Sequence, residues 1–218
     1  MQKPKVYEAK NFDCLLGKTR DVLNELVDTA PFLSNYSLVG GSALSLYLCH
    51  RKSEDLDFFT YSDNFDRQTI LSYVTKFDHY EVLNDNDDQL DVLLNGVKVT
   101  FFNAKWSFLE PRQVSSLNIA TLVSIAAMKT NVLFLRAKYR DYYDLYFLAK
   151  RVMGLEEIFA CARPIVSGLT FKLFNIALLY IDDIDDDNIA HLDPLEILTK
   201  GEIRSFFEQQ FRKEVLAG

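Results

Sequence analysis

The chain has 218 residues, of which 49% are hydrophobic and 25% are charged, so it is long enough for a mixed domain with a helical extension. Its formal net charge of −7 argues against a protein that coats nucleic acid nonspecifically, because that activity needs a basic surface. The N-terminal residues lack the apolar core of a signal peptide, and no apolar run approaches the roughly 18–20 residues that span a bilayer.

The three cysteines, Cys14, Cys49 and Cys161, are far apart in the sequence and show no metal-ligand spacing. We therefore expect ordinary thiols in a reducing compartment, and a cytoplasmic protein that does not associate with membranes. The histidines share no ligand spacing with these cysteines, which argues against a zinc site.

The N-terminal half alternates predicted helices and strands. Leucines at helical spacing predict an amphipathic helix over 12–27, and Pro31 closes that region. A short apolar strand over 36–39 enters a glycine turn, after which Ser42 can cap a helix that runs to about His50. Further along, the pattern predicts a half-buried strand over 55–60, a helix over 66–76 and a strand over 79–83.

Residues 89–102 give the clearest local pattern. Two runs, 89–94 and 97–102, flank Asn95-Gly96, which is typical of a hairpin with a two-residue turn. This register places Asp91 opposite Thr100 on the same face of the pair.

The sequence turns helical from about Asn118. Its periodicity predicts helices over 119–135, 140–151, 155–163, 169–181 and 200–214. We therefore predict an α+β fold, with a mixed α/β domain over 1–112 and an all-helical domain over 113–218 packed against it.

The residues that suggest chemistry are Gly40-Gly41-Ser42 and, twelve residues later, Asp55-Leu56-Asp57. Glycines after a strand let the backbone approach a phosphate, and a serine at a helix N-terminus supplies further donors. Asp55 and Asp57 project from one face of a strand, where they repel each other unless a cation such as Mg²⁺ lies between them. Each motif alone also occurs as an ordinary turn or a solvated strand end, but together they predict phosphoryl or nucleotidyl transfer.

The string GGSALSLYLCHRKSEDLDFF fits the glycine-then-D-x-D signature of the nucleotidyltransferase superfamily. It resembles the branch typified by the AbiEii toxin of abortive-infection systems, and the resemblance continues at SLNIATLVSIAAMKTNVLFLRAKYRDYYDLYFLAK. The resemblance implies a small mixed sheet flanked by helices and followed by a helical domain. It also implies that Gly40, Gly41 and Ser42 contact nucleotide phosphates, and that Asp55 and Asp57 bind Mg²⁺.

The resemblance implies a second cluster of site residues, Lys129, Asp141 and Asp144. Lys129 can neutralise triphosphate charge, and the two carboxylates, three residues apart on one helix face, can orient Lys129 or an acceptor hydroxyl. A structural salt bridge between helices is the alternative.

Arg51 and Ser53 precede the carboxylates, at positions that are usually Arg and Ser or Thr in this branch. We assign both to nucleotide binding, in which Arg51 steadies a phosphate. A purely structural pairing of Arg51 with Asp55 remains open.

The sequence departs from the superfamily pattern at the third carboxylate, which active members commonly carry on a neighbouring strand. The corresponding residue is Thr100, which can accept a hydrogen bond but cannot act as a base. We hypothesise that Asp91, across the hairpin from Thr100, supplies the missing carboxylate, and the alternative is a solvated aspartate on an edge strand.

We therefore predict an Mg²⁺-dependent nucleotidyltransferase that moves a nucleoside monophosphate from an NTP to an acceptor. The resemblance implies a toxin of a toxin–antitoxin or phage-defence pair, with RNA or tRNA as acceptor and an antitoxin as partner. The basic run Lys129, Arg136 and Arg140, spaced for one face of a continuous helix, is the candidate RNA or triphosphate contact. A degenerate module that binds NTP and a partner without turnover is the alternative that Thr100 favours, and D-x-D alone also allows a kinase-like phosphotransferase.

The acidic run 181–188 lacks the glycine and glutamate of an EF-hand loop. We predict a solvated helix terminus or a partner surface there.

Overall fold

The computed structural model describes residues 12–61, 65–106, 111–114, 117–186 and 188–217. Two predictions fall partly outside the described residues: the absence of a signal peptide at the N-terminus, and the acidic run, which includes Asp187. The chain divides into two compact units, Met1–Thr121 and Leu122–Gly218.

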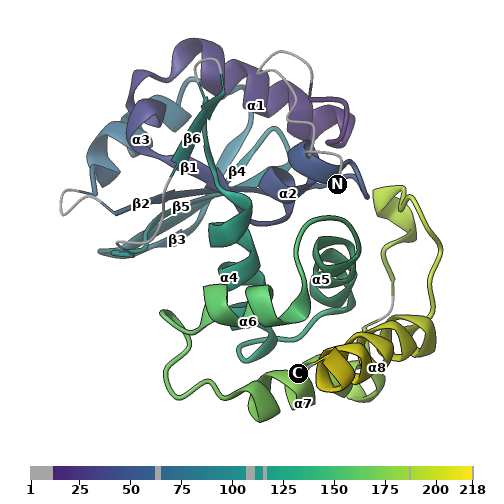
Figure 1. Cartoon of the computed structure of the whole chain (residues 1–218). Coiled ribbons are helices and arrows are strands. Elements are labelled where there is room, and N and C mark those ends of the chain that lie inside the picture. Colours follow the sequence, from purple (N-terminus) through teal and green to yellow (C-terminus); the bar gives the residue numbers. More distant parts are fainter. Residues whose placement is uncertain (1–11, 62–64, 107–110, 115–116, 187, 218) are drawn as a thin grey trace. The chain divides into compact units, whose positions relative to one another are not determined.

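The first unit is built on a mixed sheet that has seven strands within the described residues, in the order β3-β4-β5-β2-β1-β7-β6 (Figure 1). The strands are β1 (Ser37–Val39), β2 (Leu56–Thr60), β3 (Tyr80–Asp85), β4 (Gln89–Leu94), β5 (Val97–Asn103), β6 (Pro111–Val114) and β7 (Leu117–Ala120). The central strand β2 runs parallel to β5 and antiparallel to β1. Together with the helices below, this sheet confirms the predicted α+β fold.

The helices of the first unit are α1 (Gly17–Thr29), α2 (Gly40–Leu48) and α3 (Arg67–Val74), with a 3₁₀ helix η1 (Pro31–Asn35) after α1. Pro31 occupies the first position of η1, where its missing N–H group costs nothing. The Asp66 side chain caps α3 by accepting a hydrogen bond from the Thr69 amide. α1 and α3 lie on one side of the sheet (Figure 1).

The two faces of the sheet differ in burial. On β2, Leu56 and Phe58 are fully buried, whereas Asp57 and Phe59 are only half-buried. Phe58 stacks on Phe101 of β5 in the core, with ring centroids 5.5 Å apart. One face therefore forms the core, and Asp57 projects from the other.

The hairpin prediction is confirmed residue by residue. β4 and β5 pair from Leu94↔Val97 outward, and Asp91 lies opposite Thr100. The turn residues Asn95 and Gly96 both have positive φ, 48° and 83°, as a two-residue hairpin turn requires.

The prediction that Ser42 caps a helix is wrong. α2 begins at Gly40, with Val39 as its N-cap residue and no side-chain cap. Gly40 has φ +68° and begins the helix at once, which leaves Ser42 inside the first turn.

The prediction of a helix from residue 119 is also wrong at its start. Residues Leu117–Ala120 form β7, which pairs in parallel with β1, and α4 begins only at Leu122. A short apolar run is compatible with either structure, and the neighbouring strand decides between them. The first compact unit includes β7 and extends to Thr121.

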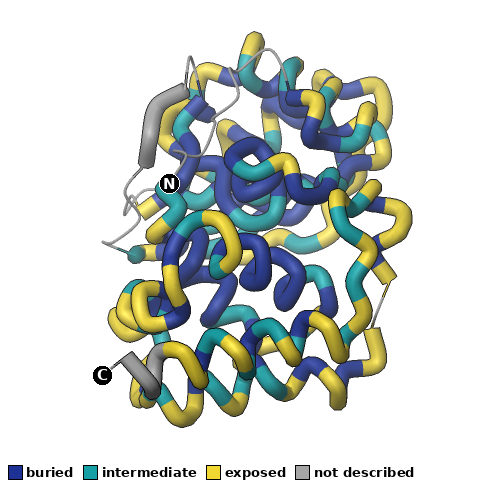
Figure 2. Tube along the Cα trace, turned by 45° about the vertical axis from the view of Figure 1, so that its right-hand side comes forward, coloured by how far each residue is buried: buried dark blue, intermediate teal, exposed yellow. Residues whose placement is uncertain are grey.

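The second unit is helical throughout its described residues. Its helices are α4 (Leu122–Leu133), α5 (Tyr139–Arg151), α6 (Leu155–Ala162), α7 (Phe171–Leu179), η2 (Tyr180–Asp183), η3 (Ala190–Leu192) and α8 (Lys200–Ala217). α4 packs against α5 and α6, and α8 packs against α5 and α7. Much of α5 is buried, its tyrosines and its phenylalanine included (Figure 2).

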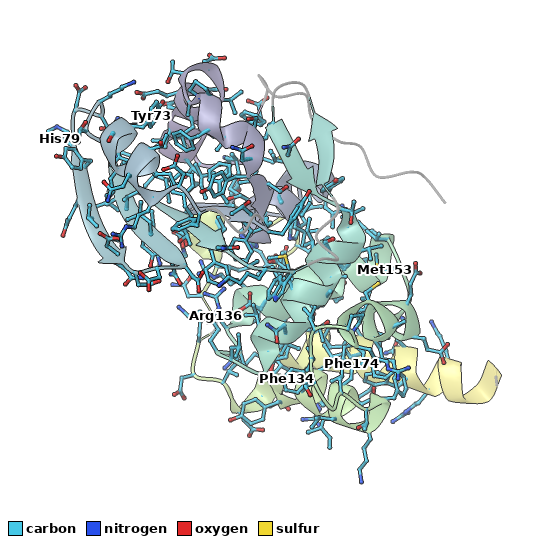
Figure 3. All side chains as sticks on the ribbon, turned by 90° about the vertical axis from the view of Figure 1, so that its left-hand side faces the viewer. Tyr73, His79, Phe134, Arg136, Met153 and Phe174 are labelled. Atoms are coloured by element: carbon cyan, nitrogen blue, oxygen red, sulfur yellow. A yellow bond between two sulfur atoms is a disulfide. The ribbon has the colours of Figure 1, made fainter. Side chains whose placement is uncertain are left out.

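The prediction that Lys129, Arg136 and Arg140 lie on one continuous helix is wrong. α4 ends at Leu133 and α5 begins at Tyr139, and Ala137 between them has φ +42°. Arg136 lies in this connection (Figure 3), so the seven-residue spacing from Lys129 does not place the two on one helix face.

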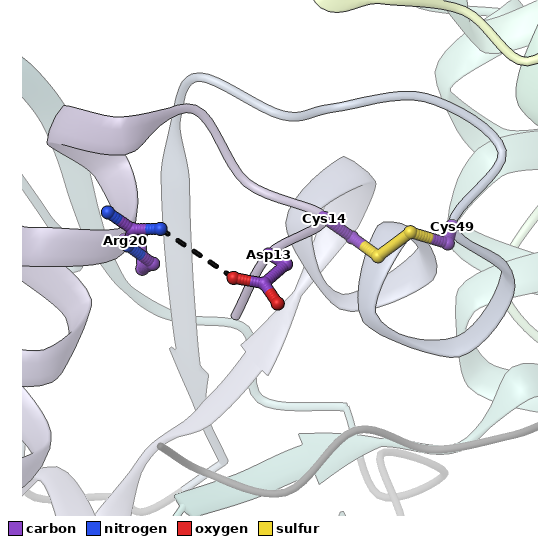
Figure 4. Close-up of a disulfide and its surroundings, with 4 residues drawn as sticks. All are labelled: Asp13, Cys14, Arg20 and Cys49. Carbon is purple, nitrogen blue, oxygen red and sulfur yellow. Dashed lines mark ion pairs between the residues drawn. A yellow bond between two sulfur atoms is a disulfide. The ribbon is translucent and has the colours of Figure 1, made fainter. Parts of the chain in front are cut away.

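The prediction of ordinary thiols is wrong for Cys14 and Cys49, which form a disulfide with a Cα–Cα distance of 5.3 Å (Figure 4). Their separation of 35 residues gave no indication of this, because the two cysteines meet only in the folded chain. The cysteines therefore do not indicate a reducing compartment. Within the described part of the chain, no helix combines the length and the apolar character that crossing a membrane requires.

Candidate active site

The glycine turn between β1 and α2 packs directly against Asp57. A Cβ atom on Gly40 would lie 2.7 Å from the carboxylate oxygen Oδ2 of Asp57, closer than such contacts allow. Glycine at this position therefore lets the carboxylate reach the first turn of α2. The N–H groups and the dipole of a helix N-terminus favour negative charge at that place.

Gly41 leaves room for the guanidinium group of Arg51. A Cβ atom on Gly41 would lie 2.6 Å from Nη2 of Arg51 and 3.4 Å from Oγ of Ser53. Arg51 is 3% exposed, and its Nη1 also donates to the carbonyl of Lys52 at 2.9 Å. A guanidinium charge thus lies against the same turn that Asp57 approaches.

Ser42 joins this turn to the carboxylate pair. Its hydroxyl donates a hydrogen bond to the backbone carbonyl of Asp55, and its side chain is buried. Ser42 therefore holds the chain at the start of β2, in addition to any role in phosphate binding.

The loop that carries Arg51, Ser53 and Asp55 is fixed from the N-terminal side. The amide of Leu16 donates to the carbonyl of Ser53 at 3.0 Å, and the hydroxyl of Thr19 donates to the carbonyl of Glu54 at 2.9 Å. The disulfide fastens the start of the same loop. Residues 12–19 thus hold the loop in place.

A row of side chains crosses the sheet at Asp57. Asp57 pairs with Thr100 of β5, and Thr100 pairs with Asp91 of β4. The Thr100 hydroxyl donates to Oδ1 of Asp91 at 2.7 Å, and Nε2 of Gln89 donates to Oδ2 at 2.8 Å. Asp91 is therefore separated from Asp57 by the width of β5, and both of its oxygens accept hydrogen bonds.

Asp91 does not complete a metal cluster with the carboxylate pair. Among the residues that the structure describes, no group of three or more His, Cys, Asp and Glu side chains has a geometry that could hold a metal ion. Gln89 was not foreseen from the sequence, although its position two residues before Asp91 on an alternating strand places both on one face.

Lys129, Asp141 and Asp144 meet inside the helical unit. The Lys129 ammonium lies 2.9 Å from Oδ1 of Asp141 and 2.6 Å from Oδ2 of Asp144, and these side chains are 6%, 0% and 0% exposed. Arg136 adds a second cation, 3.6 Å from Asp141. A cluster so buried and so completely paired satisfies the requirements of a structural salt bridge and also those of a preorganised charged site.

The sequence matches no family model. An uncharacterized protein of Aquifex aeolicus, aq_aa25, is 29% identical over 204 residues, which are 91% of this chain and 97% of the relative. The two chains therefore correspond over nearly their whole lengths.

Two solved structures from Helicobacter pylori share the fold. A putative nucleotidyltransferase is 21% identical with a TM-score of 0.55, over 92% of this chain and 94% of that chain. JHP933 is 21% identical with a TM-score of 0.56, over 98% of this chain and 97% of that chain. At this identity the likeness establishes the fold, and the chain accordingly has the fold of a protein described as a putative nucleotidyltransferase.

Proposed function

We propose that this chain is an Mg²⁺-dependent nucleotidyltransferase that transfers a nucleoside monophosphate from an NTP to an acceptor. The observation that supports it most is the packing of the Asp57 carboxylate and the Arg51 guanidinium against Gly40 and Gly41 at the N-terminus of α2. This arrangement combines an acidic group for a metal with donors and positive charge for phosphates.

Asp55 and Asp57 are the residues that would hold Mg²⁺. Two carboxylates beside a turn that admits phosphate oxygens suit this ion, which binds few protein groups and completes its shell with phosphates and water. When bound, the ion would neutralise negative charge on the reacting phosphate and the departing pyrophosphate. The chain's own part is to fix both carboxylates: Ser42 holds the backbone of Asp55, and Gly40 admits the side chain of Asp57.

The phosphates of the NTP would lie at the first turn of α2. Backbone N–H groups there have no partners within the helix and point toward an anion. Arg51 and Ser53, on the other side of Gly41, add positive charge and a hydroxyl close to this turn. The carboxylates of Asp55 and Asp57, at the start of β2, would then face the reacting phosphate.

Thr100 would receive the acceptor hydroxyl, and Asp91 would position Thr100. The Thr100 proton is directed to Asp91, which leaves the lone pairs of the threonine oxygen to accept a hydrogen bond from the acceptor. In this proposal Asp91 replaces the third carboxylate indirectly, through one hydroxyl, rather than by contact with the metal.

Lys129 would neutralise triphosphate charge, with Asp141 and Asp144 holding its ammonium in place. The sequence resemblance to AbiEii-type toxins carries this assignment. The same resemblance supports a cytoplasmic toxin with RNA or tRNA as acceptor, and with a cognate antitoxin as protein partner.

Incubation with each labelled NTP, Mg²⁺ and total tRNA tests the function, with Asp57→Asn as the comparison. Label on RNA with the wild type and not with Asp57→Asn supports transfer and identifies the base. Asp66→Asn is a matched control, since it changes an exposed aspartate of the same unit, whose side chain caps α3. Loss of transfer in both variants would implicate folding rather than the site.

The second candidate is a module that binds NTP and a partner without turnover. Thr100 in place of a carboxylate favours it, because a threonine cannot act as a base and both oxygens of Asp91 already accept hydrogen bonds from Thr100 and Gln89. Saturable binding of Mg²⁺–NTP without labelled RNA or labelled protein would select this candidate.

A further inference from the structure

We propose that Phe59, Phe102 and Trp106 form a stacking site for a nucleobase beside Asp57. The proposal rests on the proposed function, because the base belongs to a nucleotide or an RNA end that reacts at the carboxylate pair. It adds a binding site that phosphate and metal contacts alone do not supply.

The three rings form one group. Phe59 and Phe102 are paired residues on β2 and β5, with ring centroids 5.0 Å apart and planes at 63°. The Trp106 ring lies 6.0 Å from that of Phe59. Backbone register therefore fixes two of the rings, and Trp106 extends the apolar surface just beyond the end of β5.

This group lies on the face that carries Asp57. Phe59 is two residues after Asp57 on β2, and Phe102 is two residues after Thr100 on β5, so all four side chains project to the same side. The polar row through Asp57 and Thr100 and the aromatic row through Phe59 and Phe102 are therefore neighbours, about 7 Å apart along the strands.

These rings lie on the opposite face of the sheet from its main aromatic core. The core face has its own aromatic pair, Phe58 and Phe101, which is fully buried and stacked. Phe59, Phe102 and Trp106 are each half-buried, so every one of them retains surface that another ring can cover. Aromatic surfaces of this kind bind nucleobases by stacking, and every base offers a suitable face.

The position along β2 fits the geometry of the reaction. The residues that would bind the phosphates lie near Asp57 or before it in the chain: Gly40 is next to Asp57, and Gly41 is next to Arg51. Phe59 lies further along β2, on the other side of Asp57. In-line transfer places the attacking hydroxyl opposite the departing pyrophosphate, and the nucleoside also extends away from it. The base that stacks here therefore comes from the incoming NTP or from the acceptor end, and both share the chemistry that the rings recognise.

Trp106 is the one tryptophan in the sequence, so its fluorescence reports on this site alone. The probes are a non-hydrolysable NTP analogue with Mg²⁺, a short oligoadenylate without NTP, and inorganic triphosphate with Mg²⁺. We expect saturable quenching by a probe that contains a base and none by triphosphate. Response to the NTP analogue alone assigns the incoming base, and response to oligoadenylate alone assigns the acceptor.

Variants separate stacking from folding. Phe59→Leu should weaken binding of the responding probe by about 5- to 100-fold, while Phe59→Tyr, which keeps the ring, should bind like the wild type. Phe206→Leu removes a half-buried ring from a comparable aromatic pair, with Tyr146 in the helical unit, and should leave binding unchanged. Thermal unfolding of each variant shows whether the fold is intact.

Two results would overturn the proposal and can be told apart. If triphosphate binds, as measured by calorimetry, and no base-containing probe binds more tightly or quenches Trp106, the aromatic site is rejected and the phosphate site stands. If none of the probes binds, the proposed function fails together with the stacking site.

Discussion

Gly40 and Asp57 are in such close contact that a single methyl group on the glycine would lie 2.7 Å from the carboxylate oxygen. The contact joins the end of β1 to the second residue of β2, which are paired strands. It explains why the carboxylate that the sequence marks as a metal ligand and the turn that it marks as a phosphate contact lie at one place.

Gly40→Ala should therefore abolish Mg²⁺–NTP binding while the protein stays folded. Gly96→Ala is the matched control, because Gly96 also has positive φ, +83° against +68°, but a methyl group added to it would have nothing within 4 Å. Both variants should lose about 1–2 kcal/mol of unfolding free energy from the left-handed backbone. Calorimetry measures Mg²⁺–NTP binding to each variant. If binding is lost in both variants, or in neither, the Gly40–Asp57 contact does not have the role given to it.

The Thr100–Asp91 hydrogen bond should couple the two residues in stability. Thr100→Val leaves a buried carboxylate oxygen without its donor and should cost about 1–3 kcal/mol. In a cycle with Asp91→Ala, which removes the acceptor, we expect an interaction free energy of about 0.5–3 kcal/mol from urea unfolding. Thr69→Val removes an exposed hydrogen bond of 2.7 Å from the Thr69 hydroxyl to Asp66. This variant should lose less unfolding free energy than Thr100→Val. Additive losses at Thr100 and Asp91 would show that the pair does not act as a unit.

Lys129→Met should destabilise the protein strongly, because two fully buried carboxylates lose their nearest cation. We expect a loss of about 3–5 kcal/mol in unfolding free energy. Lys150→Met is the control, because the Lys150 side chain that pairs with Glu196 is more than a third exposed. This variant should lose at most about 1 kcal/mol of unfolding free energy.

Recovery identifies the cause of that loss. Combining Lys129→Met with Asp141→Asn and Asp144→Asn removes the buried charges together and should restore much of the stability. If the triple variant is no more stable than Lys129→Met, the lysine contributes through packing rather than charge.

The pair of Lys150 and Glu196 should make stability depend on pH in the acid range. The hydrogen bond from the Lys150 ammonium lowers the pKa of the Glu196 carboxyl. A lowered folded-state pKa stabilises the protein above the unfolded pKa of about 4.3, and this stabilisation is lost as the pH falls through the folded value. Glu196→Gln should thus be less stable than the wild type at pH 7, by at most about 1 kcal/mol, and equal to it at the acid end of the transition. Urea unfolding over this pH range measures the difference, and a difference independent of pH would contradict it.

Thiol titration checks the cysteine arrangement. Denatured, unreduced protein should show one thiol, that of Cys161, and three after reduction. Burial, with a smaller effect of Glu157, raises the pKa of the Cys161 thiol, so its alkylation in the folded protein should be slow near neutral pH and speed up as the pH rises. Three thiols without reduction would contradict the disulfide.

The sequence alone determined those features that depend on local chemistry. Asn95-Gly96 dictates a two-residue hairpin turn, because only such residues accept positive φ at both positions, and the turn then sets Asp91 opposite Thr100. Alternation over 55–60 likewise fixed which side chains of β2 leave the core. Periodicity identified α5 and α8 because their apolar residues recur at the helical spacing.

Tertiary structure decided the features that depend on residues far apart in the chain. Whether Leu117–Ala120 becomes strand or helix depends on hydrogen bonds to β1, some eighty residues earlier, and local propensity cannot supply that partner. The sequence likewise identified both glycines but not the contacts that need them, since Asp57 and Arg51 reach the turn only after β2 has paired with β1. The disulfide has the same origin, because its two cysteines are 35 residues apart in the sequence and meet only in the folded chain.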